Sequence, residues 1–157
     1  MVDSSMPQAE IITPAMKDLL GVESAPVTFD VEKGHVRRFA EAVGDLNPLY
    51  IDEGEASKTR YGSIIAAPTF FRSMLVEPPD IDIAKETGME NKLDGGSEWE
   101  FFESVRPGDR ISATARFSDF TAREGRMGTM LYVSVDNTYR NQLGATVATQ
   151  RMTRIIY

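Results

Sequence analysis

A short polar stretch, Asp45-Leu46-Asn47-Pro48-Leu49-Tyr50, combines side chains that could do chemistry. The carboxylate of Asp45 suits acid–base work if it has a partner, and the phenol of Tyr50 can donate a hydrogen bond. The stretch follows Gly44 and contains a proline, so we expect it on a loop held by flanking secondary structure, where functional sites tend to lie. A structural alternative is that Asp45 and Asn47 only shape the turn after a helix.

The elements around this stretch can be predicted from the spacing of apolar residues. Val27 to Val31 alternates apolar and polar residues, as a half-buried strand does. From Glu32 the period changes to that of an amphipathic helix, which Gly44 ends. Asp52, with Glu55 three positions later, nearly matches a capping box and predicts a second, short helix. The apolar stripe of the first helix is Val36, Phe39, Ala40 and Val43.

A third helix is expected from Pro68, because proline is well suited to the first helical position. This helix should end before Pro78-Pro79, and it has almost no polar face. We therefore expect it to be buried. Its apolar residues are Phe70, Phe71, Met74 and Leu75.

Beyond Gly95-Gly96 the sequence becomes a series of strands. The first contains Trp99, Phe101 and Phe102, and turns at 106–109, 124–128 and 141–144 separate three further alternating segments. We expect three hairpins in series, and hence an α+β domain in which a five-stranded antiparallel sheet packs on a buried helix. Glu98 and Glu100 share one strand face, which indicates an exposed face or a salt-bridge pair in a dimer.

Composition excludes several classes of function. The 157 residues suit one domain, and the absence of cysteine excludes thiol chemistry. A net charge of −7 argues against a general affinity for nucleic acid. The sequence has no apolar run of membrane-spanning length, and its first seven residues do not read as a signal peptide, so we expect a cytoplasmic protein. We find no metal-ligand spacing and no phosphate-binding glycine loop.

Several motifs together resemble the MaoC-like hot-dog family, in its MaoC dehydratase N-terminal domain branch. They are Ala42-Val43-Gly44-Asp45, Asn47-Pro48-Leu49-Tyr50, the run from Tyr61 to Phe70, and the run from Gly95 to Asp109. The resemblance implies a hot-dog domain over residues 27–157, preceded by an N-terminal arm over residues 1–26. It also implies (R)-specific enoyl-thioester hydration or 3-hydroxyacyl-thioester dehydration, no cofactor, and paired units that form one ten-stranded sheet.

The hydratase signature of that family is Asp-x-Asn-Pro-x-His, and here the histidine is replaced by Tyr50. Because a phenol has an unperturbed pKa of about 10, Tyr50 is a poor general base and better suited as a pocket wall or hydrogen-bond donor. The one histidine, His35, lies ten positions before Asp45 on the preceding predicted helix, roughly 15 Å away along the helix axis. We interpret His35 as a solvated surface residue.

The resemblance also implies the residues that contact the substrate. Asp45 and Tyr50 are the catalytic candidates, and Asn47, Gly62, Ala67, Thr69 and Phe71 are the substrate-binding candidates. Backbone N–H groups near the start of the third helix could polarise a thioester carbonyl, or could simply start that helix. Phe71 could line an acyl pocket, although aromatic residues at helical spacing are first of all core residues.

Four functions remain open. The first is an acyl-CoA or acyl-carrier-protein binding subunit that needs a histidine-bearing hot-dog partner. The second is a self-sufficient homodimeric hydratase using Asp45, alone or with Tyr50. The third is a hot-dog thioesterase, for which residues 69–76 lack the acid of the central helix and only Glu77 stands at its end. The fourth is a non-catalytic acyl-CoA-binding module in fatty acid metabolism.

Overall fold

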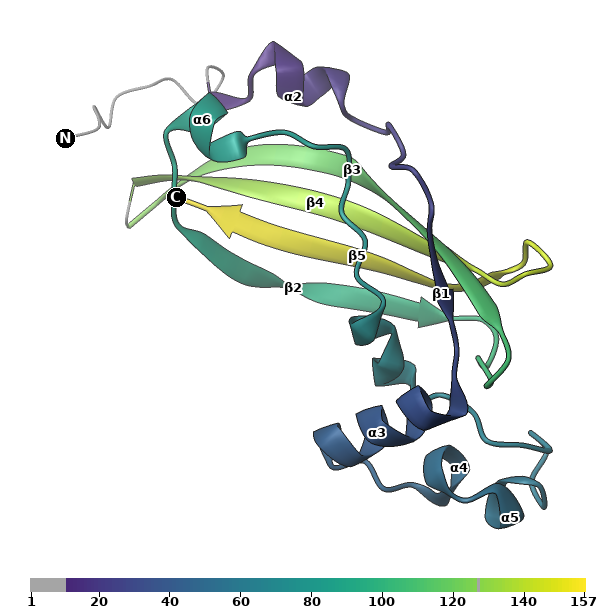
Figure 1. Ribbon diagram of the computed structural model, residues 1–157. Coiled ribbons are helices and arrows are strands. Elements are labelled where there is room, and N and C mark those ends of the chain that lie inside the picture. Colours follow the sequence, from purple (N-terminus) through teal and green to yellow (C-terminus); the bar gives the residue numbers. More distant parts are fainter. Residues whose placement is uncertain (1–10, 127) are drawn as a thin grey trace.

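A five-stranded antiparallel sheet forms most of the computed structural model, which describes residues 11–126 and 128–157 (Figure 1). Its strands are β1 (Val27–Asp30), β2 (Lys92–Phe101), β3 (Arg110–Gly125), β4 (Gly128–Arg140) and β5 (Thr146–Ile156). Their order across the sheet is β1-β3-β4-β5-β2. Together with the central apolar helix described below, this sheet confirms the α+β hot-dog architecture expected from the sequence.

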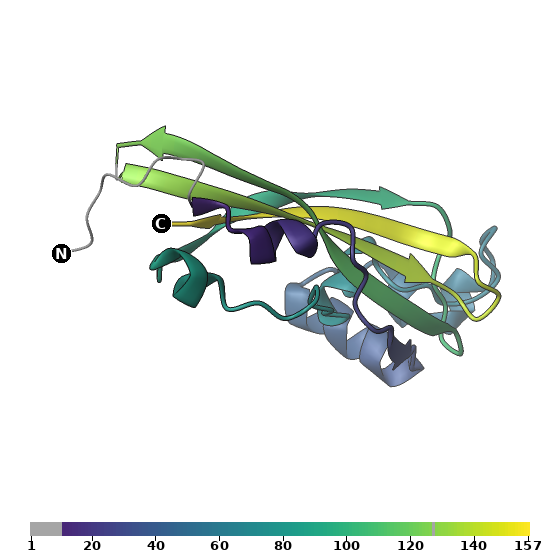
Figure 2. The same ribbon diagram turned by 90° about the horizontal axis from the view of Figure 1, so that it is seen from above.

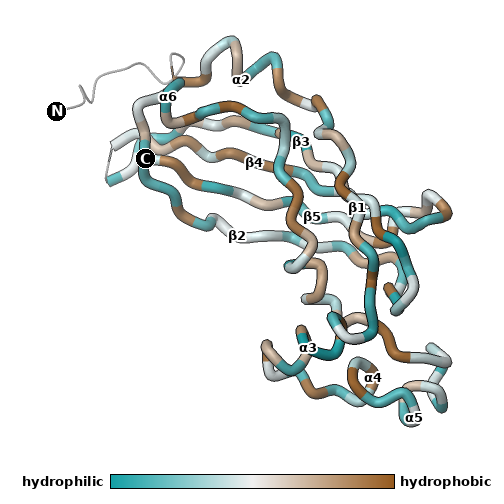
Figure 3. The backbone as a smooth tube through the Cα atoms, viewed as in Figure 1, coloured by the Kyte–Doolittle hydropathy of each residue, from teal (hydrophilic) through white to brown (hydrophobic). Residues whose placement is uncertain are grey.

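The two faces of the sheet differ because side chains alternate along each strand. In β4, buried and half-buried residues alternate from Met130 to Arg140, and the hydropathic alternation can be followed in Figure 3. The inner face carries the core, including Leu131, Val133, Val135 and Tyr139 of β4 and Ile111 of β3. The opposite, outer face carries charged and hydroxyl side chains such as Asp136 and Thr138.

The described helices are α2 (Pro14–Asp18), α3 (Lys33–Val43), α4 (Pro48–Ile51), α5 (Glu53–Ala56), the 3-10 helix η1 (Pro68–Ser73) and α6 (Ile83–Thr87). Most of them lie on the inner side of the sheet (Figure 2), and α4 and α5 lie beyond one end of it (Figure 1). None of these helices is both long enough and apolar enough to cross a bilayer.

Helix α3 follows its predicted apolar pattern except at Val43, which is 52% exposed. Val36 and Ala40 are buried, and Phe39 packs edge to face on Phe70 with 5.4 Å between ring centroids. Gly44 ends the helix in the left-handed conformation, with φ of 74°, and its N–H donates to the carbonyl of Glu41. The prediction of the helix and of its end is confirmed.

The next helices are shorter than predicted. The run after Asn47 forms two single-turn helices, α4 and α5, and the Asp52 side chain accepts the N–H of Glu55 at 3.1 Å, as the capping pattern predicts. The central apolar element η1 is a six-residue 3-10 helix that buries Phe70 and Phe71. Its turn ends at Met74, so Leu75 points outward and is 68% exposed, contrary to the expected burial.

The predicted series of three hairpins is wrong at its first member. β2 pairs with β5, not with β3, with Trp99 opposite Gln150 and Phe101 opposite Ala148. The edge of β3 that faces away from β4 is already paired with β1, where Val27 lies opposite Ala113. β2 therefore crosses to the other side of the sheet and becomes its free edge.

The described part of the predicted arm lies along the same edge of β3. The N–H of Gly21 donates to the carbonyl of Phe117 at 2.9 Å, and the N–H of Ser24 donates to that of Ala115 at 2.8 Å. Residues 1–10 of the arm and Met127 of the predicted 124–128 turn lie outside the described residues. The boundary of the hot-dog domain at residue 27 stays a prediction.

Candidate functional site

A hollow of about 230 Å³ lies where α4, the start of η1 and the end of β2 meet. Its wall includes two residues predicted from the sequence, Tyr50 and Phe71. Other wall residues come from segments far apart in the chain: Leu49, Tyr61, Phe101 and Phe102. The phenols of Tyr50 and Tyr61 thus lie at the rim of this hollow, beside its aromatic wall.

Local backbone bonds place Tyr50 at this rim. The Asn47 side chain accepts the N–H of Leu49 at 3.0 Å, and its carbonyl accepts the N–H of Tyr50 at 2.9 Å. The carbonyl of Leu49 in turn accepts the N–H of Ile65, which ties α4 to the segment that leads into η1. Asn47 is the N-cap of α4, so its structural role is shown, and it does not line the hollow.

The surroundings of Tyr50 keep its phenol protonated. Partial burial raises the pKa of Tyr50 above its ordinary value, and the nearby charges of Asp45 and Tyr61 raise it further. At neutral pH the phenol is therefore a proton donor and cannot serve as a general base. This agrees with the hydrogen-bond donor role inferred from the sequence.

Asp45 lies beside Tyr50 without forming part of the wall. Its N–H donates to the carbonyl of Ala40 at 2.9 Å, which fixes the backbone just after Gly44. The side chain is exposed, and no hydrogen bond or ion pair to it is found among the described residues. Its carboxylate is thus free to act on a bound molecule or on a partner group.

Phe71 belongs to the core and to the wall at once. Its ring is 4% exposed and packs on three other rings, with centroid distances of 5.0 Å to Tyr139, 5.8 Å to Phe101 and 6.0 Å to Trp99. Such aromatic contacts stabilise beyond the area they bury. The cluster gives the hollow a rigid apolar side suited to an acyl chain.

The backbone donors expected near η1 are partly occupied. The N–H of Ala66 donates to the carbonyl of Val105, and the N–H of Gly62, a turn residue with φ of 68°, donates to the carbonyl of Thr59. Ala67 and Thr69 differ, because no acceptor for either N–H is found among the described residues. Neither residue lines the hollow beside Tyr50, and Ala67 is 2% exposed, so these donors lie outside its wall.

Two residues weighed in the sequence lie elsewhere. His35 is exposed, has its Nε2 3.7 Å from a carboxylate oxygen of Glu32, and lines a separate hollow with Phe39 and Phe70. Glu77, the thioesterase candidate, is held by Arg154, whose Nη2 donates to both carboxylate oxygens at 2.8 and 2.9 Å. Neither residue lines the hollow beside Tyr50.

Sequence reasoning missed the second phenol of the rim. Arg60 donates to the Tyr61 hydroxyl at 2.7 Å and lies over its ring, while Arg106 donates to the Tyr61 carbonyl at 3.2 Å. The only local signal was the turn at Tyr61-Gly62, since the contacts with Tyr50 and with Arg106 are tertiary. In the described residues, no group of three or more His, Cys, Asp or Glu side chains is placed to hold a metal ion.

Residues 18–150 match the family described as the FAS1-like, dehydratase domain region. The chain is also 30% identical, over 132 residues, to a Thermomonospora curvata protein described as a probable enoyl-CoA hydratase alpha subunit. That match covers 74% of this chain and 41% of the relative, so the chain spans less than half of the relative's length.

Solved structures share the fold. The ChsH1-ChsH2 complex from Mycobacterium tuberculosis contains a chain with a TM-score of 0.76 and 16% identity, covering 87% of this chain and 84% of that one. The HadBC (3R-hydroxyacyl-ACP dehydratase) complex from the same organism gives a TM-score of 0.68 at 23% identity, covering 88% and 97%. At these identities the likeness establishes the fold alone.

Proposed function

Because this chain belongs to the family of the FAS1-like dehydratase domain region, we propose that it is the acyl-thioester-binding hot-dog subunit of an (R)-specific enoyl-CoA hydratase or 3-hydroxyacyl dehydratase. In this proposal a partner hot-dog subunit supplies the catalytic histidine. The observation that carries it is the hollow beside Tyr50, where an aromatic wall meets a phenol that stays protonated.

The reaction itself needs no cofactor. Water adds across the enoyl double bond: a hydroxyl joins C3 and a proton joins C2, so the thioester and the oxidation state of the molecule as a whole are unchanged. Hydration requires a base to take a proton from water and a donor to stabilise the developing enolate oxygen. Tyr50 can donate to that oxygen, while Asp45 can hold the water.

A general base is what the hollow lacks. Asp45 is exposed and Tyr50 is protonated, and in this proposal the imidazole that completes the family signature comes from another chain. The free edge of β2 offers a place for that chain, since Phe101 and Phe102 at its end are exposed and also line the hollow. The related ChsH1-ChsH2 and HadBC structures are complexes, which supports a two-subunit assembly.

A self-sufficient homodimer is the second candidate. The observation in its favour is that Asp45 lies close enough to Tyr50 for its charge to raise the pKa of the phenol. In that case the carboxylate takes the proton from water, and Tyr50 stabilises the thioester oxygen. A non-catalytic acyl-CoA-binding module would use the same hollow without any chemistry.

Calorimetric titration with butyryl-CoA, which lacks the reactive double bond, tests the binding claim. We expect the chain to bind it, and Phe102→Ser to weaken binding severalfold because Phe102 lines the hollow. Leu75→Ser is the matched control, since Leu75 is also an exposed apolar residue but lies outside the hollow. Equal binding by both variants, or none by the unmodified chain, would contradict the proposed site.

A further inference from the structure

The outer face of the sheet, defined here as the side of β2–β5 away from the helices, carries four charged residues in one straight row. Strand register places Glu98 of β2 opposite Arg151 of β5, Arg151 opposite Asp136 of β4, and Asp136 opposite Arg116 of β3. The row therefore alternates in sign across four neighbouring strands. We call these four residues the charge row.

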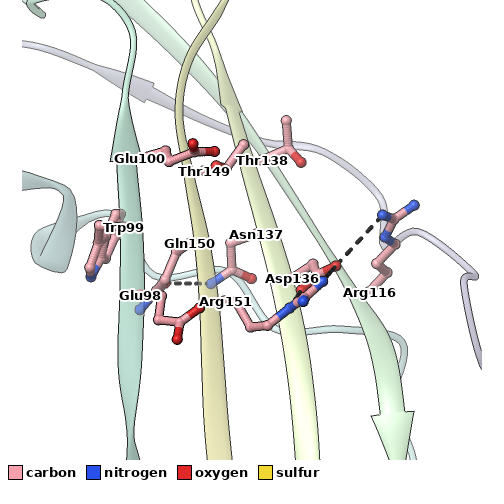
Figure 4. A pocket seen from close by; sticks show the side chains of 10 residues that line it. All are labelled: Glu98, Trp99, Glu100, Arg116, Asp136, Asn137, Thr138, Thr149, Gln150 and Arg151. Carbon is pink, nitrogen blue, oxygen red and sulfur yellow. Dashed lines mark hydrogen bonds and ion pairs between the residues drawn. The ribbon is translucent and has the colours of Figure 1, made fainter.

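The charge row is ordered around Asp136 (Figure 4). Arg151 donates to both of its carboxylate oxygens at 2.8 and 3.0 Å, Ser118 donates at 3.1 Å, and Arg116 approaches to 3.6 Å. The Arg151 hydrogen bonds lower the pKa of Asp136, against the opposing effect of burial. Asp136 is thus held as a carboxylate, and all four members of the charge row line an open hollow of about 360 Å³.

Two further rows run parallel to the charge row on the same face. One places Leu93, Ile155, Tyr132 and Thr121 side by side, and is the more apolar. The other places Glu100, Thr149, Thr138 and Thr114 side by side. None of the described helices covers these rows, because the helices lie on the inner side of the sheet (Figure 2) or beyond its end (Figure 1).

An alternating row of four charges is complementary to itself when its order is reversed. A two-fold axis parallel to the strands, lying between β4 and β5, reverses the order without shifting the rows along the strands. Glu98 then faces Arg116 of a second copy, and Arg151 faces its Asp136. The same rotation sets Ile155 against Tyr132 and Thr149 against Thr138, so no row meets a like charge.

We propose that the outer face binds the outer face of a second copy of this chain, with the two charge rows lying over each other in opposite order. Glu23 lies opposite Arg116 on the segment beside β3 and adds a fifth charge to the row. An axis centred on β4 would set like charges together. An axis between β4 and β5 leaves Glu23 beyond the edge of the opposite sheet.

The face is large enough for such a contact. Four strands about 4.8 Å apart, each about 11 residues long at about 3.3 Å per residue, present roughly 700 Å² per copy. Two copies would bury about 1,400 Å², which lies within the usual range for specific interfaces. Stacked sheets commonly align their strands within about 30°, so the twist of the sheet does not prevent the contact. This contact is separate from the β2 edge used in the proposed function.

Sedimentation equilibrium of the purified chain tests the proposal. We expect reversible self-association that weakens as salt is added, because charges face each other across the contact. Glu98→Arg and Arg116→Glu should each weaken association at least tenfold, since the two-fold axis repeats each new like-charge contact. A solvated face, which antiparallel sheets often present, would show no association that depends on these residues, and would overturn the proposal.

The double variant Glu98→Arg with Arg116→Glu provides the most direct test of the proposed contact. Within one chain the two residues are three strand spacings apart, roughly 14 Å, so neither charge reversal can directly compensate for the other there. Across the proposed contact they face each other, and the double variant should regain the association of the unmodified chain. Failure to regain it, in variants that circular dichroism shows to be folded, would overturn the proposal.

Glu100→Arg is the matched control, because it makes the same charge change on the same strand face but faces Thr114 of the second copy. It should leave association within a few-fold of the unmodified value. If a charge-reversed chain fails to fold, Glu98→Gln and Arg116→Gln provide milder tests, and each should weaken association without reversing a charge.

Discussion

Tyr50 and Asp45 lie close enough for the carboxylate to raise the pKa of the phenol, yet only Tyr50 lines the hollow. The pair occupies the two ends of the family signature, with the imidazole position filled by a group that holds its proton. In the proposed function, this relationship separates the binding of a thioester, which the hollow would carry out, from base catalysis, which a partner would supply.

Replacing the phenol by imidazole should supply the missing base. We expect Tyr50→His to raise crotonyl-CoA hydration by about 10²-fold or more, because general base catalysis contributes on this scale. The loss of enoyl-thioester absorbance measures the rate. Tyr50→Phe is the control and should give no gain; a similar gain in both variants would mean that relief of crowding, and not the imidazole, is responsible.

Phe70 and Phe71 are neighbours on η1 with different surroundings. Both are buried, so Phe70→Leu and Phe71→Leu should each lower the free energy of unfolding by about 1 kcal/mol. Only Phe71 lines the hollow beside Tyr50, so only Phe71→Leu should shift the preferred acyl chain length toward longer chains. Chemical denaturation and binding of an acyl-CoA length series measure the two effects, and an equal shift in both variants would argue against this wall.

Gly34 and Gly44 lie in and at the end of α3 and should respond to alanine in opposite directions. Gly34 is inside the helix with nothing within 4 Å of an added Cβ, so Gly34→Ala should stabilise by about 0.5 to 1 kcal/mol. Gly44 has φ of 74°, so Gly44→Ala should destabilise by about 1 kcal/mol. Thermal unfolding measures both, and effects of the same sign would contradict the helix end placed at Gly44.

Tyr139 should make the protein sensitive to alkali. Burial raises its pKa to about 12 in the folded state, from 10.0 when unfolded. Between these values the unfolded chain binds fewer protons than the folded one, so stability falls as pH rises, by about 2 to 3 kcal/mol in all. Below pH 10 this contribution is constant.

Comparison with Tyr139→Phe isolates this effect from the other tyrosines. The variant loses the hydrogen bond to the carbonyl of Met74 but should show a shallower decline in the free energy of unfolding above pH 10. Denaturant titrations over a series of pH values provide the measurement. Parallel declines in the two proteins would show that Tyr139 titrates normally when folded.

Local patterns in the sequence predicted much of the fold. The apolar period and Gly44 located α3, and strict alternation located the strands, because these features depend on neighbouring residues. The family resemblance is confirmed by the match over residues 18–150. The pairing of β2 with β5 was missed because strand order depends on which edge is already occupied, here by β1, and short-range spacing does not report it.

The site was predicted in part for the same reason. Tyr50 and Phe71 were found from the motif, and both line the hollow. Tyr61 and Phe102 join them only through the packing of the 61–66 segment and the end of β2. The 3-10 geometry of η1 could not be predicted from the sequence either, since proline and aromatic residues fit the first turn of either helix type.

Hydration of crotonyl-CoA by the purified, unmodified chain tests the central claim most directly. The chain should bind the thioester but turn it over no faster than its Asp45→Asn variant does, because the hollow contains no general base. Turnover should appear when a hot-dog subunit with an intact Asp-x-Asn-Pro-x-His motif, copurified from the native host, is added. Robust turnover by the chain alone, abolished by Asp45→Asn, would contradict the account and favour the self-sufficient homodimer.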